Sequence, residues 1–402
     1  MDEWFAGRWT PLETVVGWRF GHDPLTLPHV ESSPRTVLEE HLREVLERTP
    51  CLVQFSGGRD SSALLALAIH VARRDGFDEP VAFTRRYPGI TAADESAWQE
   101  RVVRHLNVRD WERVEIHDEL DAIGPIAGPL VQRFGPLWPP AAHSNVPAFE
   151  RARGGSVITG EGGDNVFGPQ RTSVLLRTMI RRQRLNRAAL SALWSAHAPR
   201  PLRRRALERK ARSSPRRQWL TPAAFEAFVD AHVRDELGQP LDWAASIGWQ
   251  MGSKAWQDGY RFMERLASDY DVELAHLLSD IRFVGSLRPI AGRLGFRSRA
   301  DIMLRLFGDL LPEAILRRVD KAYFNASLFR EPSRRFAVEW DAAWTLRDLV
   351  DPDSLRSTWR SELPHAGLIT PLQAAWREAP VDPNYEQPTS RQGRAARENQ
   401  PR

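Results

Sequence analysis

The chain has 402 residues, which is enough for two or three domains and a substantial hydrophobic core. Hydrophobic residues make up 42% of it and charged residues 27%, and no apolar run approaches the roughly 20 residues that cross a bilayer, so fibrous and membrane-spanning classes are excluded. The net charge is +4, and the single cysteine, Cys51, excludes an internal disulfide framework or a cysteine metal cluster. The N-terminus carries no signal-peptide pattern. We therefore expect a soluble, cytoplasmic protein with no membrane partner.

The first half of the chain alternates between predicted helices and strands. Residues 1–33 are rich in Trp, Pro and Gly and predict a short packed extension. A helix is predicted over 34–48, a strand over 51–55, and a helix that ends near Gly76. Further strands are predicted over 81–84, 111–116 and 156–159, with helical material over 93–106 and up to about residue 153. This alternation predicts an α/β fold with a parallel sheet flanked by helices.

The loop after the first strand, residues 56–62, carries the sequence Ser-Gly-Gly-Arg-Asp-Ser-Ser. A glycine pair lets the backbone turn sharply, so that N–H groups converge on an anion at a helix start. Asp60 would repel a bare phosphate, which implies a divalent cation between the two. The loop therefore predicts a site for the pyrophosphate of ATP. A plain glycine turn, capped by Ser61 or Asp60, is the alternative.

A second loop follows the strand predicted over 156–159 and carries the sequence Gly-Glu-Gly-Gly-Asp over residues 160–164. Ligands bind parallel sheets beyond the carboxyl ends of the strands, so we expect both loops to face one crevice. Asp60 and Asp164 could then share one Mg²⁺ between phosphates. A glycine turn with solvated acids is the alternative for this loop.

The second half of the chain predicts helices and a basic segment. Residues 171–217 hold fifteen Arg or Lys and one acid, Glu208. Few aromatic residues interleave them, so a mobile basic segment or a surface for an acidic partner is favoured over nucleic-acid binding. From about residue 221 the pattern predicts helices whose aromatic residues are core packing, including a helix pair over 301–318 broken at Pro312. We expect a domain over 34–340, a helical extension over 341–378 and a disordered tail over 379–402.

Lysine is rare in this arginine-rich chain and occurs only at positions 210, 254 and 321. Lysine offers a compact ammonium that the planar guanidinium of arginine does not reproduce. Lys321 stands in the sequence Arg-Arg-Val-Asp-Lys over residues 317–321 and is therefore a candidate for a chemical role. A structural salt bridge is the alternative for this lysine.

These three segments, 56–62, 159–164 and 317–321, together resemble the synthetase domain of the asparagine synthetase family. That family also includes β-lactam synthetases and lasso-peptide macrolactam cyclases. The resemblance covers about residues 35–335 and implies an adenine nucleotide α-hydrolase-like fold that uses ATP and Mg²⁺. It also implies an ATP-dependent, AMP-forming carbon–nitrogen ligase, in which a carboxylate is adenylated and then attacked by ammonia or another amine.

The resemblance assigns roles to residues at matching positions. Asp60 and Asp164 match metal ligands, Glu161 matches the residue that positions or deprotonates the amine, and Lys321 matches the residue that steadies developing negative charge. The implied ATP-binding residues are Phe55, Ser56, Gly57, Gly58, Asp60, Ser61, Ser62, Phe83, Thr159 and Gly160.

Two departures from the family pattern concern the substrates. Residue 2 is Asp and not the cysteine of a glutaminase domain, so we expect the amine to be ammonia from a separate source or a group on the substrate. Asn165 replaces the usual acid after Asp164, as in lasso cyclases. Aspartate amidation and macrolactam closure of a peptide, with or without a peptide-carrier partner, stay open. An enzyme that adenylates tRNA bases and a non-catalytic nucleotide-binding protein are the alternatives from other classes.

Overall fold

The computed structural model describes residues 9–168, 170, 198–213, 217–319, 322–362 and 364–379. Within them, five strands form one parallel sheet in the order β3-β2-β1-β4-β5. The strands are β1 (Cys51–Gln54), β2 (Val81–Arg86), β3 (Trp111–Glu115), β4 (Ser156–Ile158) and β5 (Glu273–Ala275). The predicted parallel α/β sheet is therefore confirmed. Because β1 and β4 are neighbours, the loops that follow them leave the sheet side by side.

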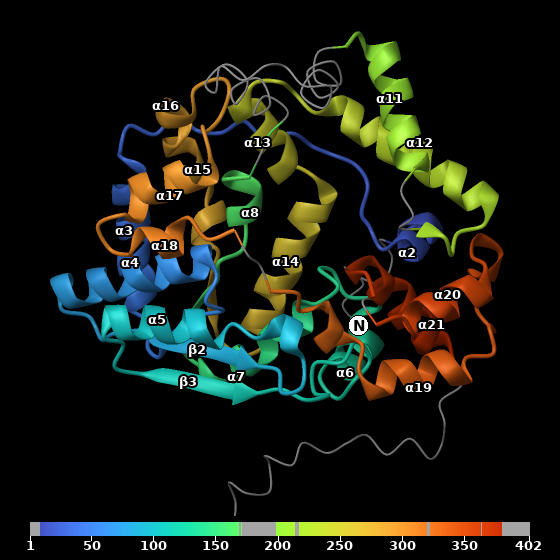
Figure 1. Cartoon of the computed structure of the whole chain (residues 1–402), viewed down its shortest axis with the longest axis horizontal. Coiled ribbons are helices and arrows are strands. Elements are labelled where there is room, and N and C mark those ends of the chain that lie inside the picture. The colour runs from blue at the N-terminus through green and yellow to red at the C-terminus, as the bar shows by residue number, and fades with distance from the viewer. Residues whose placement is uncertain are drawn as a thin grey trace, which may run out of the picture.

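Helices cover both faces of this sheet (Figure 1). Against one face pack α3 (Pro34–Leu46), α4 (Arg59–Asp75), α5 (Ser96–Leu106), α15 (Ile281–Ser286), α17 (Arg299–Phe307) and α18 (Glu313–Leu316). Against the other pack α6 (Ala127–Phe134), α7 (Val146–Arg151) and α14 (Lys254–Ser268). The single-turn helices η1 (Thr91–Ala93) and η2 (Ala142–Asn145) and the short helices α8 (Gly163–Val166) and α16 (Arg288–Ala291) occupy connections.

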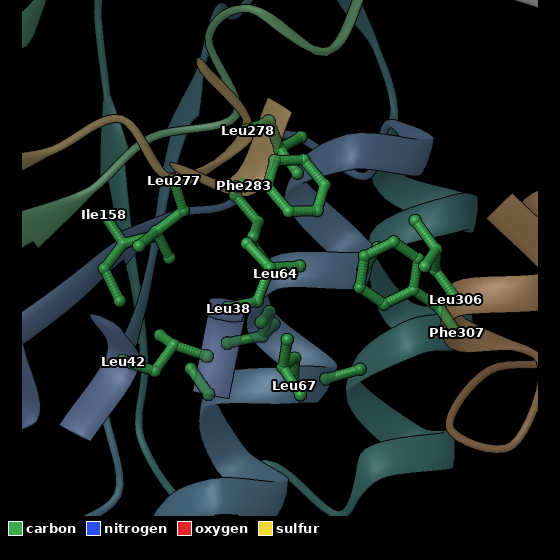
Figure 2. Packing of buried hydrophobic residues seen from close by; sticks show 14 of the residues in the cluster. Leu38, Leu42, Leu64, Leu67, Ile158, Leu277, Leu278, Phe283, Leu306 and Phe307 are labelled. Atoms are coloured by element: carbon green, nitrogen blue, oxygen red, sulfur yellow. The ribbon is translucent and has the colours of Figure 1, made fainter. Parts of the chain in front are cut away.

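The core between the sheet and α4 is built from aliphatic residues at helical spacing. Leu64 and Leu67 of α4 lie among Leu38 and Leu42 of α3, while Leu306 and Phe307 approach from α17 (Figure 2). All of these side chains are 5% exposed or less. Burial of a Leu or Phe side chain stabilises a fold by roughly 1.5–3 kcal/mol, so this cluster fixes the start of α4 firmly against β1.

A second cluster of buried residues joins the N-terminal part of the chain to the C-terminal helices. It combines α2 (Pro11–Val16), α12 (Pro222–Gly238) and the segment η5 (Asn325–Leu328), α19 (Glu331–Glu339), η6 (Arg347–Leu349), α20 (Pro352–Trp359), η7 (Ala366–Leu368) and α21 (Ile369–Glu378). In Figure 1 these helices lie beside the sheet domain, with α13 (Trp243–Met251) and α14 between them. The helical C-terminal part is therefore present as predicted.

The helical pattern predicted from residue 221 onward fails at β5. Its three residues are too few to show the alternation of a strand in the sequence, and they become extended because β4 offers an unpaired edge. Immediately after β5 the chain forms η4 (Leu277–Ser279) and returns to helix. Pro312 interrupts the predicted helix pair, standing immediately before α18.

The basic segment falls only partly within the described residues. Residues 171–197 and 214–216 lie outside them, whereas α11 (Arg200–Arg212) packs against α12. Arg204 and Arg212 pair with acids of both helices, and the buried Arg203 side chain donates to backbone carbonyls at the end of α12. Part of the positive charge is therefore neutralised within the fold. Among the described residues, no helix is long and apolar enough for a bilayer.

Candidate active site

The glycine-rich loop after β1 makes a sharp turn and then enters α4. Gly57 has φ +83°, and a Cβ atom there would lie 2.9 Å from Cγ of Gln99, so only glycine fits. Within the turn, Ser56 N–H donates to Oγ of Ser61 (3.2 Å) and Gly58 N–H donates to Oγ of Ser56 (3.3 Å). Among the described residues, no side chain caps the N-terminus of α4. Its first N–H groups and the positive end of its dipole are thus available to an anion.

The loop after β4 approaches this turn closely. A Cβ atom on Gly160 would lie 3.3 Å from the Ser61 nitrogen, and one on Gly163 would lie 2.6 Å from the Asp60 carboxylate. Both loops stand at the carboxyl edge of the sheet because β1 and β4 are parallel neighbours. The two segments predicted from sequence to face one crevice therefore touch each other.

Arg299, at the start of α17, bridges the two aspartates that the sequence singles out. One terminal nitrogen of its guanidinium donates to Asp60 Oδ2 and the other donates to Asp164 Oδ1. The side chains of Arg299 and Asp60 are each 16% exposed. Burial raises the pKa of Asp60 above its ordinary value, and the charge of Arg299 opposes that rise. Asp60 and Asp164 thus lie close enough for one cationic group to contact both.

This arrangement fits a magnesium ion held between protein and phosphate. A cationic guanidinium already stands between the two carboxylates, and the described residues contain no group of three or more acidic, His or Cys side chains that could hold a metal alone. Mg²⁺ in nucleotide sites takes one or two carboxylates from the protein and its remaining ligands from phosphates and water. Asp60 and Asp164 supply that number of carboxylates.

A cavity of about 510 Å³ opens over these loops. Its lining includes most of the predicted site residues, namely Phe55, Ser56, Gly58, Asp60, Ser61, Phe83, Thr159, Gly160, Glu161 and Asp164. Gly57 does not line it but shapes the turn. Ser62 does not line it either, because its side chain faces the core beneath α4 and is fully buried. Lys321 lies outside the described residues, and its neighbours Val319 and Ala322 line the cavity.

The cavity is also lined by charged residues to which the sequence motifs assign no role. Arg85, Arg299 and Glu95 lie outside those motifs, whereas Arg59 belongs to the 56–62 loop and Arg318 to the 317–321 segment. Arg318 donates to the carbonyl of Gly57 (3.1 Å) and to both carboxylate oxygens of Glu95. Gln99 of α5 donates to the carbonyl of Ser56 (3.1 Å). These contacts fasten the glycine-rich turn to α5 and to the segment before Lys321.

Thr159 connects the second loop to a buried imidazole. Its Oγ1 lies 2.6 Å from Nδ1 of His276 and accepts a hydrogen bond from the backbone N–H of Glu161 (3.4 Å). Burial lowers the pKa of His276 to about 3, so the ring is uncharged at neutral pH. Glu161 itself is exposed to the cavity at the turn of this loop. A carboxylate in that place can accept a proton from a bound amine.

The parallel sheet, the two touching loops and the paired aspartates define an ATP pyrophosphatase domain. The model of the asparagine synthase family matches residues 35–378, and the chain belongs to this family. The predicted resemblance is therefore confirmed. The match is to the family as a whole and assigns no subfamily. A search of curated proteins found no match.

Proposed function

We propose that this protein is an ATP-dependent, AMP-forming amide ligase of the asparagine synthetase type. The observation that carries the proposal is the bridge from Arg299 to both Asp60 and Asp164, which joins two loops about 100 residues apart in the sequence at one point of the sheet edge. In the proposed reaction, an oxygen of a substrate carboxylate attacks the α-phosphorus of ATP, and the bond to the leaving pyrophosphate breaks. An amine then attacks the activated carbonyl, loses a proton and displaces AMP.

The residues of the cavity have distinct tasks in this proposal. The turn of residues 56–61 and the N-terminus of α4 bind the leaving pyrophosphate through backbone N–H groups. Asp60 and Asp164 hold Mg²⁺, which when bound neutralises phosphate charge. Glu161 positions the amine and accepts its proton. Lys321 stabilises negative charge on the reacting oxygens.

A second candidate, ring closure within a peptide, is favoured by the rim of the cavity. Val319 is 85% exposed, and it lines the cavity together with the apolar side chains of Ala322 and Phe324. Aspartate and ammonia leave this apolar surface unused, whereas a peptide chain would cover it. In that case the activated carboxylate and the attacking amine belong to one molecule, and the product is a macrolactam.

The experiment measures pyrophosphate release by the purified full chain with ATP and Mg²⁺. One set of reactions contains L-aspartate and ammonia, and a second contains linear peptides with an Asp or Glu side chain and an unblocked N-terminus. Mass spectrometry identifies the amide or the loss of water that accompanies ring closure. We expect release with one of the two sets. Nucleotide binding without release in either set would contradict the ligase, and release that requires RNA would favour a tRNA-adenylating enzyme.

Two variants link that activity to the site. Asp60→Asn should reduce pyrophosphate release by at least about 100-fold, because the site loses a metal-binding carboxylate. Asp75→Asn is the matched control, since Asp75 ends the same helix, pairs among the described residues with Arg43 and Arg74, and does not line the cavity. Full activity of the Asp60 variant would remove the proposed metal bridge.

A further inference from the structure

Part of the cavity lining comes from segments outside the two phosphate loops, and we call the region that these residues line the outer lobe. It is lined by Tyr87, Ala141, Ser144, Phe324, Asn325 and Leu328. The rings of Tyr87, which follows β2, and Phe324, which precedes η5, lie 5.8 Å apart, so these two segments meet at the lobe. Among its described lining residues there are hydroxyl, amide and apolar groups and no carboxylate.

One cation, Arg85, stands at the wall of this lobe. It belongs to β2 and follows Phe83 by two residues, so both side chains lie on the sheet face covered by α6, α7 and α14. The glycine-rich turn and α4 belong to the opposite face. Arg85 is therefore separated by the sheet edge from the helix N-terminus that would bind phosphate.

Neutral acceptors hold the guanidinium of Arg85 in place. One terminal nitrogen donates to the backbone carbonyl of Ser144, and the other donates to Oε1 of Gln54 (3.3 Å). The amide of Gln54 in turn donates to Oδ1 of Asn145 (2.8 Å). This chain of hydrogen bonds orients the guanidinium without the help of any carboxylate among the described residues.

Three of the four described acids that line the cavity are engaged elsewhere, and the fourth, Glu161, belongs to the loop after β4. Asp60 and Asp164 contact Arg299, and Glu95 contacts Arg318. No described carboxylate forms an ion pair with Arg85, although its side chain is half-buried. A cation that is partly removed from water and oriented by neutral groups is electrostatically complementary to an anionic ligand.

We propose that Arg85 is a specificity-determining residue that binds a second carboxylate of the substrate, one that is not activated. This proposal rests on the proposed ligase function, because it assigns the group that holds the substrate while its other carboxylate reacts. The second carboxylate is either the α-carboxylate of an amino acid or the C-terminal carboxylate of a peptide. Both are flat anions that a guanidinium binds through two parallel hydrogen bonds.

The test measures binding without turnover, so that it stands apart from activity. Isothermal calorimetry is carried out on the full chain with Mg²⁺ and α,β-methylene-ATP, which does not release pyrophosphate. The first pair of probes is L-aspartate and its α-amide. The second pair is acetyl-Gly-Asp-Gly with a C-terminal carboxylate and with a C-terminal amide. Each pair differs only in the second carboxylate, and the pair that shows a preference identifies its source.

We expect one acid probe to bind at least about tenfold more tightly than its amide, as a lost charge-assisted hydrogen bond predicts. Arg85→Gln should abolish that preference, and Arg85→Lys should retain part of it. Arg86→Gln is the matched control. Arg86 is the next residue of the same strand, its side chain faces the other way, and it donates to Ser96. Thermal unfolding of each variant verifies that it is folded.

Several results would overturn the assignment of Arg85. In the unmodified protein, these results are equal affinities for the acid and the amide probe, or no binding of any acid probe. In Arg85→Gln, they are a preference for the acid probe that persists, or a loss of affinity for the nucleotide analogue as large as the loss of affinity for the acid probe. Failure of the ligase proposal looks different. In that case the acid probes bind with the expected preference, but no pyrophosphate is released when ATP replaces its analogue.

Discussion

Arg318 and Glu95 form a bidentate ion pair, and both side chains are only 5% exposed. The pair joins the segment before Lys321 to the N-terminus of α5, and Arg318 also lies 4.7 Å above the ring of Trp98. Because the same guanidinium binds the carbonyl of Gly57, one side chain connects three parts of the site that are far apart in the sequence. Its position fixes where the glycine-rich turn stands relative to the C-terminal half of the cavity.

Glu95→Gln should lower the free energy of unfolding by about 3–5 kcal/mol, because it leaves the charge of Arg318 buried without its partner. Chemical denaturation measures the change. Glu313→Gln is the control, since it breaks the Arg317–Glu313 pair, whose side chains are 51% and 63% exposed. That loss should stay below about 1 kcal/mol. Equal effects of the two substitutions would contradict the structural role of the buried pair.

Gly163→Ala should separate the two loops, because the added Cβ atom would lie 2.6 Å from the carboxylate of Asp60. We expect pyrophosphate release to fall by at least about tenfold, as displacement of a metal-binding group predicts. Gly292→Ala is the control. Gly292 has φ +54° and no atom of the described residues within 4 Å of its added Cβ, so the substitution costs about 1–2 kcal/mol of stability and leaves activity intact. Retained activity in Gly163→Ala would show that the close approach is not needed.

Arg299→Gln should make the fold more dependent on magnesium. Without the guanidinium, Asp60 and Asp164 repel each other, so stability in a chelator should fall by about 1–3 kcal/mol. Adding Mg²⁺ alone should then raise the unfolding midpoint more in the variant than in the unmodified protein. Arg305→Gln, an exposed residue of the same helix, is the control. Equal magnesium effects in the two variants would show that the carboxylates do not share one cation.

His143 should make the protein sensitive to acid. Its Nε2 lies 3.0 Å from the carbonyl of Leu120, and burial lowers the pKa of its imidazole to about 4. In the unfolded chain the imidazole of His143 has its ordinary pKa of about 6.5. The unfolded state therefore binds a proton before the folded state does, and the free energy of unfolding falls as the pH decreases from 6.5 to 4. The free energy of unfolding should fall by about 3 kcal/mol over this pH range because of His143. Because burial also lowers the pKa of His276, His143→Gln should reduce the slope of the pH dependence of unfolding over that range without abolishing it, and an unchanged slope would contradict this assignment.

The sequence predicted the parts of the site that depend on local chemistry. The glycine-rich turn and the second loop are recognisable because glycine, aspartate and strand ends follow one another along the chain. Arg299 and Arg85 were not predicted, because their partners lie at positions that only the tertiary fold brings near. Ser62 was predicted to bind ATP, yet it sits one residue further along α4 than Ser61 and so faces the core. The helical spacing of its apolar neighbours could have shown this.

The contact between Gly163 and Asp60 also limits how this site can diverge. A side chain at position 163 and an acid at position 60 would need the same space, so a mutation at one position changes what selection tolerates at the other. Among homologous chains with this arrangement of loops, the two positions should therefore vary together, with glycine retained at 163 wherever an aspartate occupies 60.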